Sequence, residues 1–199
     1  SLKLPPDLRE NIRDHFQLNH SSRMLYDETS ILRMLTPQHV SEINKHKARG
    51  IIQMVPLLSI YEHREFAQSL SPYFQRVVMG DGEVIFRKNT PGDSIYFVHK
   101  GTVHFFNTAN PDIKADHPAR SAMTGSFFGE VSVLMGLNRT MTAITSSKST
   151  LYRVEKRPLL DILEFYPGVK DRMMMAAESR FGFWEDLNDC NTPLGSLDD

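Results

Sequence analysis

Several features that are scarce in this 199-residue sequence exclude whole classes of protein. The single cysteine, Cys190, excludes an intramolecular disulfide and is typical of a chain kept in a reducing compartment. No apolar run approaches the roughly 20 residues that a membrane-spanning helix needs, and no signal peptide opens the sequence. The net charge of -1 lacks the excess of positive charge that is typical of nucleic-acid-binding proteins, so we expect no nucleic-acid partner.

Motifs for catalysis and for metal binding are also missing. The sequence has no G-x-S-x-G, no P-loop and no Cys/His pair of the nucleophilic kind. Its eight histidines lack the HxxxH spacing or any other spacing typical of metal ligands. We therefore predict that the chain is not an enzyme and that it carries no catalytic residue, metal or cofactor.

The first part of the sequence, from Leu4 to Leu70, has the periodicity of short helices. Apolar residues that recur at every fourth position share one helix face: Leu4, Leu8, Ile12 and Phe16. Thr36 and Pro37 predict a helix start, with threonine as the N-cap and proline at the first helical position. Apolar stripes on helices this short indicate that a partner surface covers them.

Between Tyr73 and Glu155 the apolar period changes to two, which is typical of strands. Glycine-bearing turns separate the short apolar runs, and the predicted strands are Val77-Val78, Val84 to Phe86, Ile95 to Val98, Val103 to Phe106 and Leu151 to Val154. We interpret the polar segment from Asn107 to Arg120, which contains two prolines, as an exposed loop. Strands of this length and spacing favour a sandwich or a small barrel.

Two helices and a polar tail follow the strand region. Pro158 opens the first helix, which ends before Pro167, and the second runs from about Val169 to Leu187. The tail, residues 188–199, is polar and contains proline and glycine, so we expect it to be disordered.

One stretch within the strand region, from Phe127 to Thr140, breaks the alternation and carries the chemistry. Gly129 and Glu130 open a short helical turn, and Arg139 follows Glu130 by nine positions. Backbone N–H groups at such a turn point at an anion, and Gly129 lets the backbone approach it closely. Arg139 can donate two charge-assisted hydrogen bonds to a phosphate. Glu130 is an acceptor suited to a sugar hydroxyl, so the pattern predicts a sugar phosphate as the ligand.

These residues resemble the phosphate-binding cassette of the cyclic-nucleotide-binding domain family. The matching motifs are Phe128-Gly129-Glu130, Arg139-Thr140, the run Gly92 to Val98, and Lys100-Gly101. The resemblance implies an α+β fold, with an eight-stranded antiparallel, jelly-roll-like β-roll, a cassette helix and C-terminal lid helices. The ligand-binding residues that it implies are Phe105, Phe128, Gly129, Glu130, Val131, Ser132, Arg139, Thr140, Arg180 and Phe181.

The helices before the strands resemble the C-linker of hyperpolarisation-activated cyclic-nucleotide-gated channels. The matching residues are Lys3-Leu4-Pro5, Leu8-Arg9, Ile12, Asp27-Glu28, Ile31-Leu32, Leu35 and Ile43. This resemblance implies a C-linker at 1–55, a cyclic-nucleotide-binding domain at 56–187 and a tail at 188–199. It also implies a homotetramer formed through the N-terminal helices, at the cytoplasmic face of a membrane and joined to the transmembrane domain of the same chain.

The resemblance implies a sensor of cyclic AMP or cyclic GMP, with cyclic AMP favoured. Its ligand would regulate an ion channel by docking the last helix, placing Arg180 and Phe181 against the base. Two alternatives stay open: the equivalent domain of a sperm-type sodium/proton exchanger, or a regulatory domain of a cyclic-nucleotide-dependent kinase. The sequence departs from the family at Ala122 and Met123, which fall where it places apolar contacts to the base, and at Phe105, where a smaller aliphatic residue is common.

Overall fold

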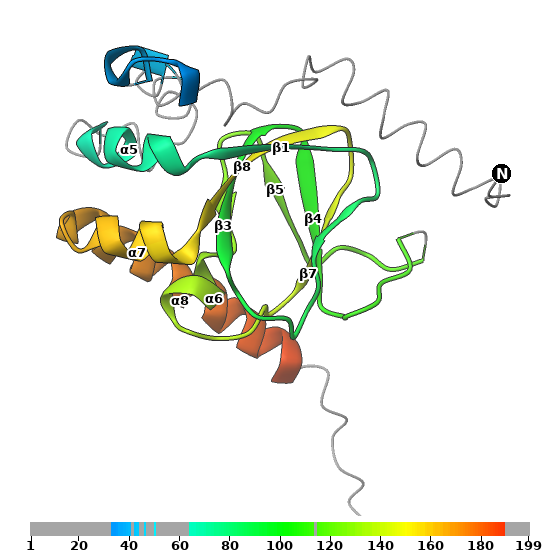
Figure 1. The fold of residues 1–199 in the computed structure, drawn as a ribbon. Helices are drawn as coiled ribbons and strands as arrows, with labels where there is room; N and C mark the ends of the chain where they lie inside the picture. The colour runs from blue at the N-terminus through cyan, green and yellow to red at the C-terminus, as the bar shows by residue number, and fades with distance from the viewer. Residues whose placement is uncertain are drawn as a thin grey trace, which may run out of the picture.

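The computed structural model describes residues 33–40, 42–43, 46, 50, 64–113 and 115–189. Two four-stranded sheets form a β-roll, and helices gather beside it (Figure 1). The elements in chain order are α5 (Arg64–Leu70), the 3₁₀ turn η2 (Ser71–Tyr73), β1 (Gln75–Met79), β2 (Val84–Phe86), β3 (Ser94–Lys100), β4 (Thr102–Phe106), β5 (Arg120–Met123), β6 (Phe127–Phe128), α6 (Glu130–Leu134), β7 (Thr142–Thr145), β8 (Ser149–Glu155), α7 (Lys156–Leu163) and α8 (Pro167–Asp189).

The strand order confirms the predicted roll. One sheet has the order β1-β8-β3-β6 and the other β2-β7-β4-β5, and neighbouring strands pair antiparallel. Strands that are distant in sequence are therefore neighbours in space, as in the double-sheet jelly roll. This pairing brings β5 beside β4 and brings the cassette next to β3.

Strand β3 separates the two parts of the core. Tyr96 and Val98 face the inside of the roll, whereas Ile95 and Phe97 face the helices. Side chains that are adjacent in a strand point to opposite faces, so a strand covered on both sides is apolar throughout. The run from Ile95 to Val98 is accordingly buried without a break.

Helices α5, α7 and α8 cover the outer face of the first sheet. Leu159 and Leu163 are four residues apart in α7 and fully buried, as are Met173 and Ala177 in α8. Residues at this spacing lie on the same helix face. Met173 joins Leu159 and Leu163 in the core cluster under the helices, and this packing anchors the first half of α8.

Five predicted strands are confirmed as β1, β2, β3, β4 and β8, but the sequence analysis missed β5, β6 and β7. All of β7 is buried, so it shows no alternation: Ala143 packs inside the roll, and Thr142 Oγ1 donates to the carbonyl of Thr108 in the segment after β4. The predicted loop ended one residue too late: Arg120 is the first residue of β5, and most of the described residues before it are exposed. The reassignment of Arg120 from the loop to β5 affects the site, because Arg120 lines the pocket described below.

The helix predictions hold with small shifts in their ends. Helix α7 begins at Lys156 rather than Pro158, and α8 begins at Pro167 and continues to Asp189, two residues into the predicted tail. The N-cap at Thr36 is confirmed, because residues 37–40 are helical and His39 donates its backbone N–H to Thr36 Oγ1 over 3.4 Å. The other features predicted for residues 1–55 and 190–199 lie almost entirely outside the described residues.

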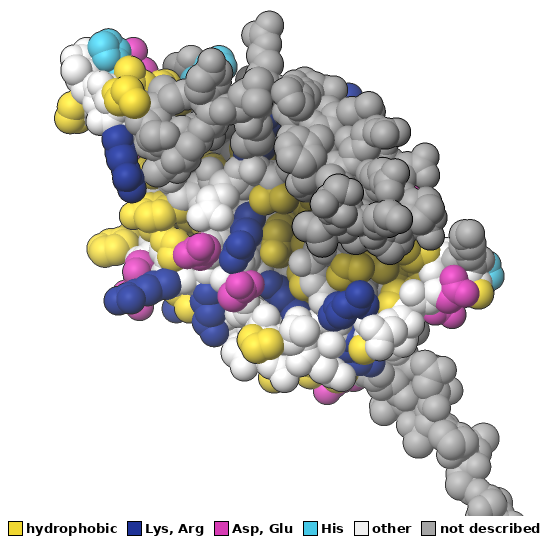
Figure 2. Space-filling view, turned by 45° about the vertical axis from the view of Figure 1, so that its right-hand side comes forward, with side chains coloured by type: hydrophobic (Ala, Val, Ile, Leu, Met, Phe, Trp, Pro, Cys, Tyr) yellow, Lys and Arg dark blue, Asp and Glu magenta, His cyan; other side chains and the backbone are white. Residues whose placement is uncertain are grey.

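Charges of both signs are mixed over the surface. On the described part of the face in Figure 2, Lys and Arg side chains (dark blue) lie among Asp and Glu side chains (magenta). This mixture agrees with the net charge of -1.

Candidate functional site

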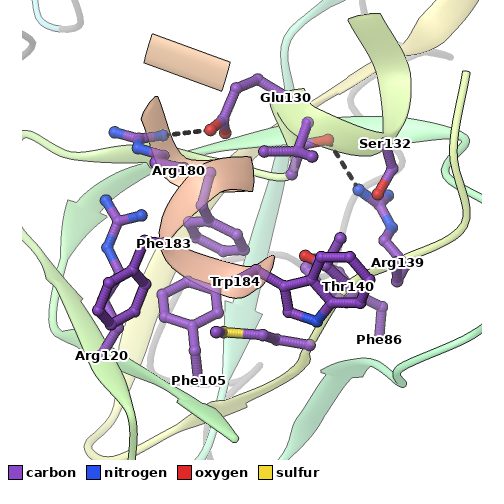
Figure 3. Close-up of a pocket in the computed structure, with 14 residues that line it drawn as sticks. Phe86, Phe105, Arg120, Glu130, Ser132, Arg139, Thr140, Arg180, Phe183 and Trp184 are labelled. Carbon is purple, nitrogen blue, oxygen red and sulfur yellow. Dashed lines mark hydrogen bonds and ion pairs between the residues drawn. The ribbon is translucent and has the colours of Figure 1, made fainter. Parts of the chain in front are cut away.

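A pocket opens at the end of the roll, between the cassette and α8 (Figure 3). The space between its lining residues is about 500 Å³, open solvent included. The lining residues are Phe86, Phe105, Arg120, Phe128, Gly129, Glu130, Val131, Ser132, Arg139, Thr140, Met141, Arg180, Phe183 and Trp184.

Gly129 shapes the cassette end of this pocket. Its φ of 87° is left-handed, and it precedes the first residue of α6. A Cβ at this position would lie 2.7 Å from Arg139 Nη1 and 3.1 Å from the carbonyl oxygen of Ser94. The first backbone N–H groups of α6 have no acceptor within the helix. Only glycine therefore combines this turn with the close approach of a guanidinium.

Arg139 is almost completely buried, with 2% of its surface exposed. Its Nη1 donates to the carbonyl of Gly129 (2.9 Å), its Nη2 donates to the carbonyl of Ser94 (2.7 Å), and its Cζ lies 4.2 Å from the Phe86 ring centre. Among the described residues, its Nε has no hydrogen-bond partner. Burial lowers the pKa of Arg139, but an arginine remains a cation in proteins.

A second set of contacts, made by Asp93, joins Arg139 to Arg153. Asp93, on the loop before β3, contacts Arg139 Nη2 at 3.5 Å and Arg153 Nη2 at 3.1 Å. Arg153 Nε also donates to Ser94 Oγ over 2.7 Å. Asp93 is 67% exposed, so its ion pairs contribute little free energy, and their main effect is to orient the two guanidinium groups.

Glu130 is the other buried charge of the pocket, with 1% of its surface exposed. Its Oε1 accepts a hydrogen bond of 2.6 Å from Arg180 Nη1. Its Oε2 is buried and, within the part of the chain that the structure describes, has no hydrogen-bond partner. A buried carboxylate oxygen without a donor is costly, so Oε2 is an acceptor available to a ligand hydroxyl.

Arg180 attaches the second half of α8 to the cassette. Besides Glu130, Nη1 donates to the carbonyl of Phe127 over 2.9 Å, and the guanidinium lies 4.6 Å from the Phe127 ring centre. One turn further along, Trp184 packs against the apolar cluster inside the roll. Helix α8 is thus held at the pocket by one charged contact and one aromatic contact.

The cassette closes on itself through Ser132 and Asn138. Ser132 Oγ donates to the carbonyl of Asn138 over 3.2 Å, and this bond joins α6 to the segment that carries Arg139. The next residue, Thr140, also lines the pocket. The two motifs recognised in the sequence therefore meet in space.

All predicted site residues except Phe181 line the pocket. Phe181 packs on Trp184 with ring centres 5.3 Å apart, and Phe183 and Trp184 line the pocket instead. Ala122 is buried in the cluster inside the roll, and Met123 is 65% exposed, so neither lines the pocket as the family position implied. Arg180 lines it, but its guanidinium contacts Glu130.

Five lining residues are absent from the predicted ligand-binding residues: Phe86, Arg120, Met141, Phe183 and Trp184. Met141 directly follows the cassette, and Phe86 ends a predicted strand, so position alone could have indicated both. Arg120 gave no signal, because it ended a polar segment interpreted as a loop.

Two kinds of feature are absent from the described ranges. No group of three or more His, Cys, Asp or Glu residues in 64–113 and 115–189 or the shorter described pieces is arranged to hold a metal ion. No helix in the described part of the chain is long and apolar enough to cross a membrane.

Comparison with known proteins identifies the family. Residues 76–166 match the model of the family described as the cyclic nucleotide-binding domain. The human potassium/sodium hyperpolarization-activated cyclic nucleotide-gated channel 4 is 30% identical over 166 residues, which cover 83% of this chain and 13% of the channel. The mouse channel 2 is 28% identical over 165 residues, which cover 83% of this chain and 18% of the channel. The chain thus spans under a fifth of these relatives. Through residues 76–166 it belongs to the cyclic nucleotide-binding domain family.

Proposed function

We propose that the roll binds a 3′,5′-cyclic nucleotide in this pocket. The observation that carries the proposal is that a buried guanidinium and a buried carboxylate oxygen, each with unused hydrogen-bonding capacity, line the same cavity. The cation is Arg139 and the oxygen is Oε2 of Glu130. A cyclic nucleotide offers a phosphate to the first group and a ribose hydroxyl to the second.

The donors at the cassette end suit a singly charged phosphate diester. Arginine has five N–H groups, and Arg139 directs three of them at Gly129, Ser94 and Asp93, which leaves two, Nε–H included. The backbone N–H groups of Glu130 to Ser132 add further donors. We place the phosphate between these two sets of donors, the ribose at Glu130 and the base toward Phe105 and Trp184.

Helix α8 is the element that the ligand would control. Arg180 and Trp184 attach it beside the proposed ribose and base positions. A ligand shifts a conformational equilibrium only through contacts that one state makes and the other lacks. We propose that bound nucleotide stabilises α8 against the cassette, with a coupling typically of about 1–3 kcal/mol.

The domain is proposed to be regulatory rather than enzymatic. The relatives are ion channels whose printed names describe gating by cyclic nucleotides, which favours a channel over the exchanger or the kinase subunit. In the parent protein, α8 would act through a C-linker at 1–55 on a transmembrane domain of the same chain, in a homotetramer at the cytoplasmic face. These statements about the whole protein rest on the likeness to the channels.

Replacing Arg139 with alanine tests the phosphate assignment. Loss of a charge-assisted hydrogen bond removes roughly 1.5–3 kcal/mol, so we expect about 10- to 150-fold weaker binding of cyclic AMP and cyclic GMP by calorimetry. Because Arg139 also supports two backbone carbonyls, Arg139→Lys is measured alongside, and thermal unfolding establishes the folded fraction. Arg157→Ala removes an exposed arginine of α7 as the matched control. Unchanged affinity in folded Arg139→Ala protein would refute the assignment.

A further inference from the structure

The polar segment between β4 and β5, residues 107–119, is attached to the roll at its beginning. Arg87, in the turn that follows β2, donates from Nη1 to the carbonyl of Ala109 over 3.1 Å. The fully buried Thr142 of β7 donates from Oγ1 to the carbonyl of Thr108. Because a cation and a buried hydroxyl both hold its backbone, the first part of this segment has a fixed position beside the roll.

Lys88, the next residue of the same turn, joins this segment to helix α8. Its Nζ donates to Oδ1 of Asn107 over 2.8 Å and to the carbonyl of the same residue over 3.3 Å. The same ammonium lies over the ring of Trp184, 5.8 Å from its centre. A cation within about 6 Å of an aromatic centre is attracted by the ring quadrupole, and tryptophan is the best partner for it. Lys88 therefore contacts the segment through hydrogen bonds and α8 through a cation–π interaction.

The contacts with Asn107 determine where the charge of Lys88 lies. A lysine side chain is flexible, and its ammonium would otherwise be free to take many positions. Here the backbone N–H of Lys88 donates to Thr142 Oγ1 over 3.0 Å, which fixes the base of the side chain. The two bonds to Asn107 fix its other end. Restricting both ends holds the ammonium beside Trp184.

The contact with Trp184 depends on the position of α8, whereas the contacts with Asn107 do not. Trp184 is in the second half of α8, lines the pocket and packs against the cluster inside the roll. If this half of the helix moves away, its ring leaves Lys88, but Lys88 and Asn107 stay together on the roll. A contact that exists in only one of two states favours that state.

We propose that Lys88 is a positioning residue for α8: Asn107 holds its charge in place, and that charge stabilises Trp184 in the docked position. This inference rests on the proposed function, because a docked α8 is the state that the nucleotide is proposed to favour. Lys88 does not itself line the pocket. A cation–π contact at a partly exposed site changes an equilibrium by roughly 2- to 5-fold.

The first test uses the complete 199-residue chain without nucleotide and measures hydrogen exchange of the amides in residues 180–189. Lys88→Met keeps an unbranched side chain but removes the charge, so exchange there should become roughly 2- to 5-fold faster. Lys88→Arg keeps a cation that donates hydrogen bonds and stacks on aromatic rings, so it should restore most of the protection. Lys148→Met, an exposed lysine between β7 and β8, is the matched control and should change nothing.

The second test measures dissociation constants for cyclic AMP and cyclic GMP in a double-mutant cycle of Lys88→Met and Trp184→Leu. If the two side chains act through their contact, the double variant should lose less affinity than the two single variants together, by roughly 2- to 5-fold. Asn107→Ala should weaken binding in the same direction as Lys88→Met but by less, because the backbone carbonyl of residue 107 remains an acceptor for Lys88.

The outcomes separate this inference from the proposed function. If exchange in residues 180–189 is the same in Lys88→Met and in the unaltered chain, Lys88 does not position α8 and the inference is wrong. Equally faster exchange in residues 180–189 and in β7 would also overturn it, because Lys88 would then stabilise the roll as a whole. Fully additive losses of affinity in the cycle would exclude the contact with Trp184. If exchange responds as expected but neither nucleotide binds to the unaltered chain, the proposed function is refuted, whereas the attachment of α8 by Lys88 is supported.

Discussion

Replacing Gly129 with alanine tests whether the backbone at the head of α6 shapes the phosphate site. Gly129 has a φ of 87°, and an added Cβ would lie 2.7 Å from Arg139 Nη1 and 3.1 Å from the carbonyl oxygen of Ser94. Contacts this short force the guanidinium or the β3 backbone to move. Because the same guanidinium is the proposed phosphate ligand, the substitution should weaken nucleotide binding without removing any ligand-binding side chain.

Two separate effects contribute to the expected change. A residue with a Cβ in the left-handed conformation costs roughly 1–2 kcal/mol of stability. Displacing Arg139 endangers charge-assisted hydrogen bonds of roughly 1.5–3 kcal/mol, so the affinity should fall by up to about 150-fold. The first effect appears in the free energy of unfolding and the second in the dissociation constant.

Gly136 provides the control that separates them. Its φ is 70°, but a Cβ there would meet nothing within 4 Å. Gly136→Ala should therefore show a similar loss of stability with unchanged nucleotide affinity. Thermal unfolding and titration calorimetry on both variants decide the matter. If both lose affinity equally, or if Gly129→Ala loses none, close packing at Gly129 does not position Arg139.

Two further predictions concern α8 and β3. Arg180→Ala removes a hydrogen bond to the buried Glu130 carboxylate, worth roughly 1.5–3 kcal/mol, so the second half of α8 should detach and shift the fluorescence emission of Trp184, the only tryptophan, to longer wavelength. Unchanged emission and hydrogen exchange in that half would contradict this role. Burial is the main cause that lowers the pKa of His99 below its ordinary value of 6.5, so the unfolded state binds the extra proton first. The stability of the unaltered protein should therefore decrease as pH falls below about 6.5, and the stability of the His99→Gln variant should decrease less. Denaturation midpoints measured across this pH range test the difference, and an identical pH dependence of the two proteins would exclude His99 as a contributor.

The two halves of α8 pack against different apolar clusters. The half of α8 that contains Met173 packs in the cluster that α5 and α7 share with the sheet. The later half depends on Arg180 and Trp184, which contact the cassette and the inside of the roll. We therefore expect the proposed ligand to act on the half of α8 with fewer buried apolar contacts, which is the half expected to open at lower free energy.

The sequence by itself determined the cassette and most of the roll. Gly129, Glu130 and Arg139 were identified from residue chemistry, because a glycine at the turn, an acceptor and a forked donor together suit a sugar phosphate. Strand β4 was predicted from its apolar period of two, and β3 from a short apolar run bounded by glycine-bearing turns. These features depend on residues close together in sequence.

Only the tertiary structure decided which residues of β5 and α8 line the pocket. Arg120 belongs to a strand of four residues that is defined by its pairing with β4, so its inward direction depends on long-range hydrogen bonds rather than on a local pattern. Likewise, Phe181 and Trp184 are both aromatic residues of α8, and which of them lines the pocket depends on the rotation at which Met173, Ala177 and Arg180 dock the helix. Helix phase and strand register are set by contacts between distant segments, and these contacts brought Arg120 to the pocket.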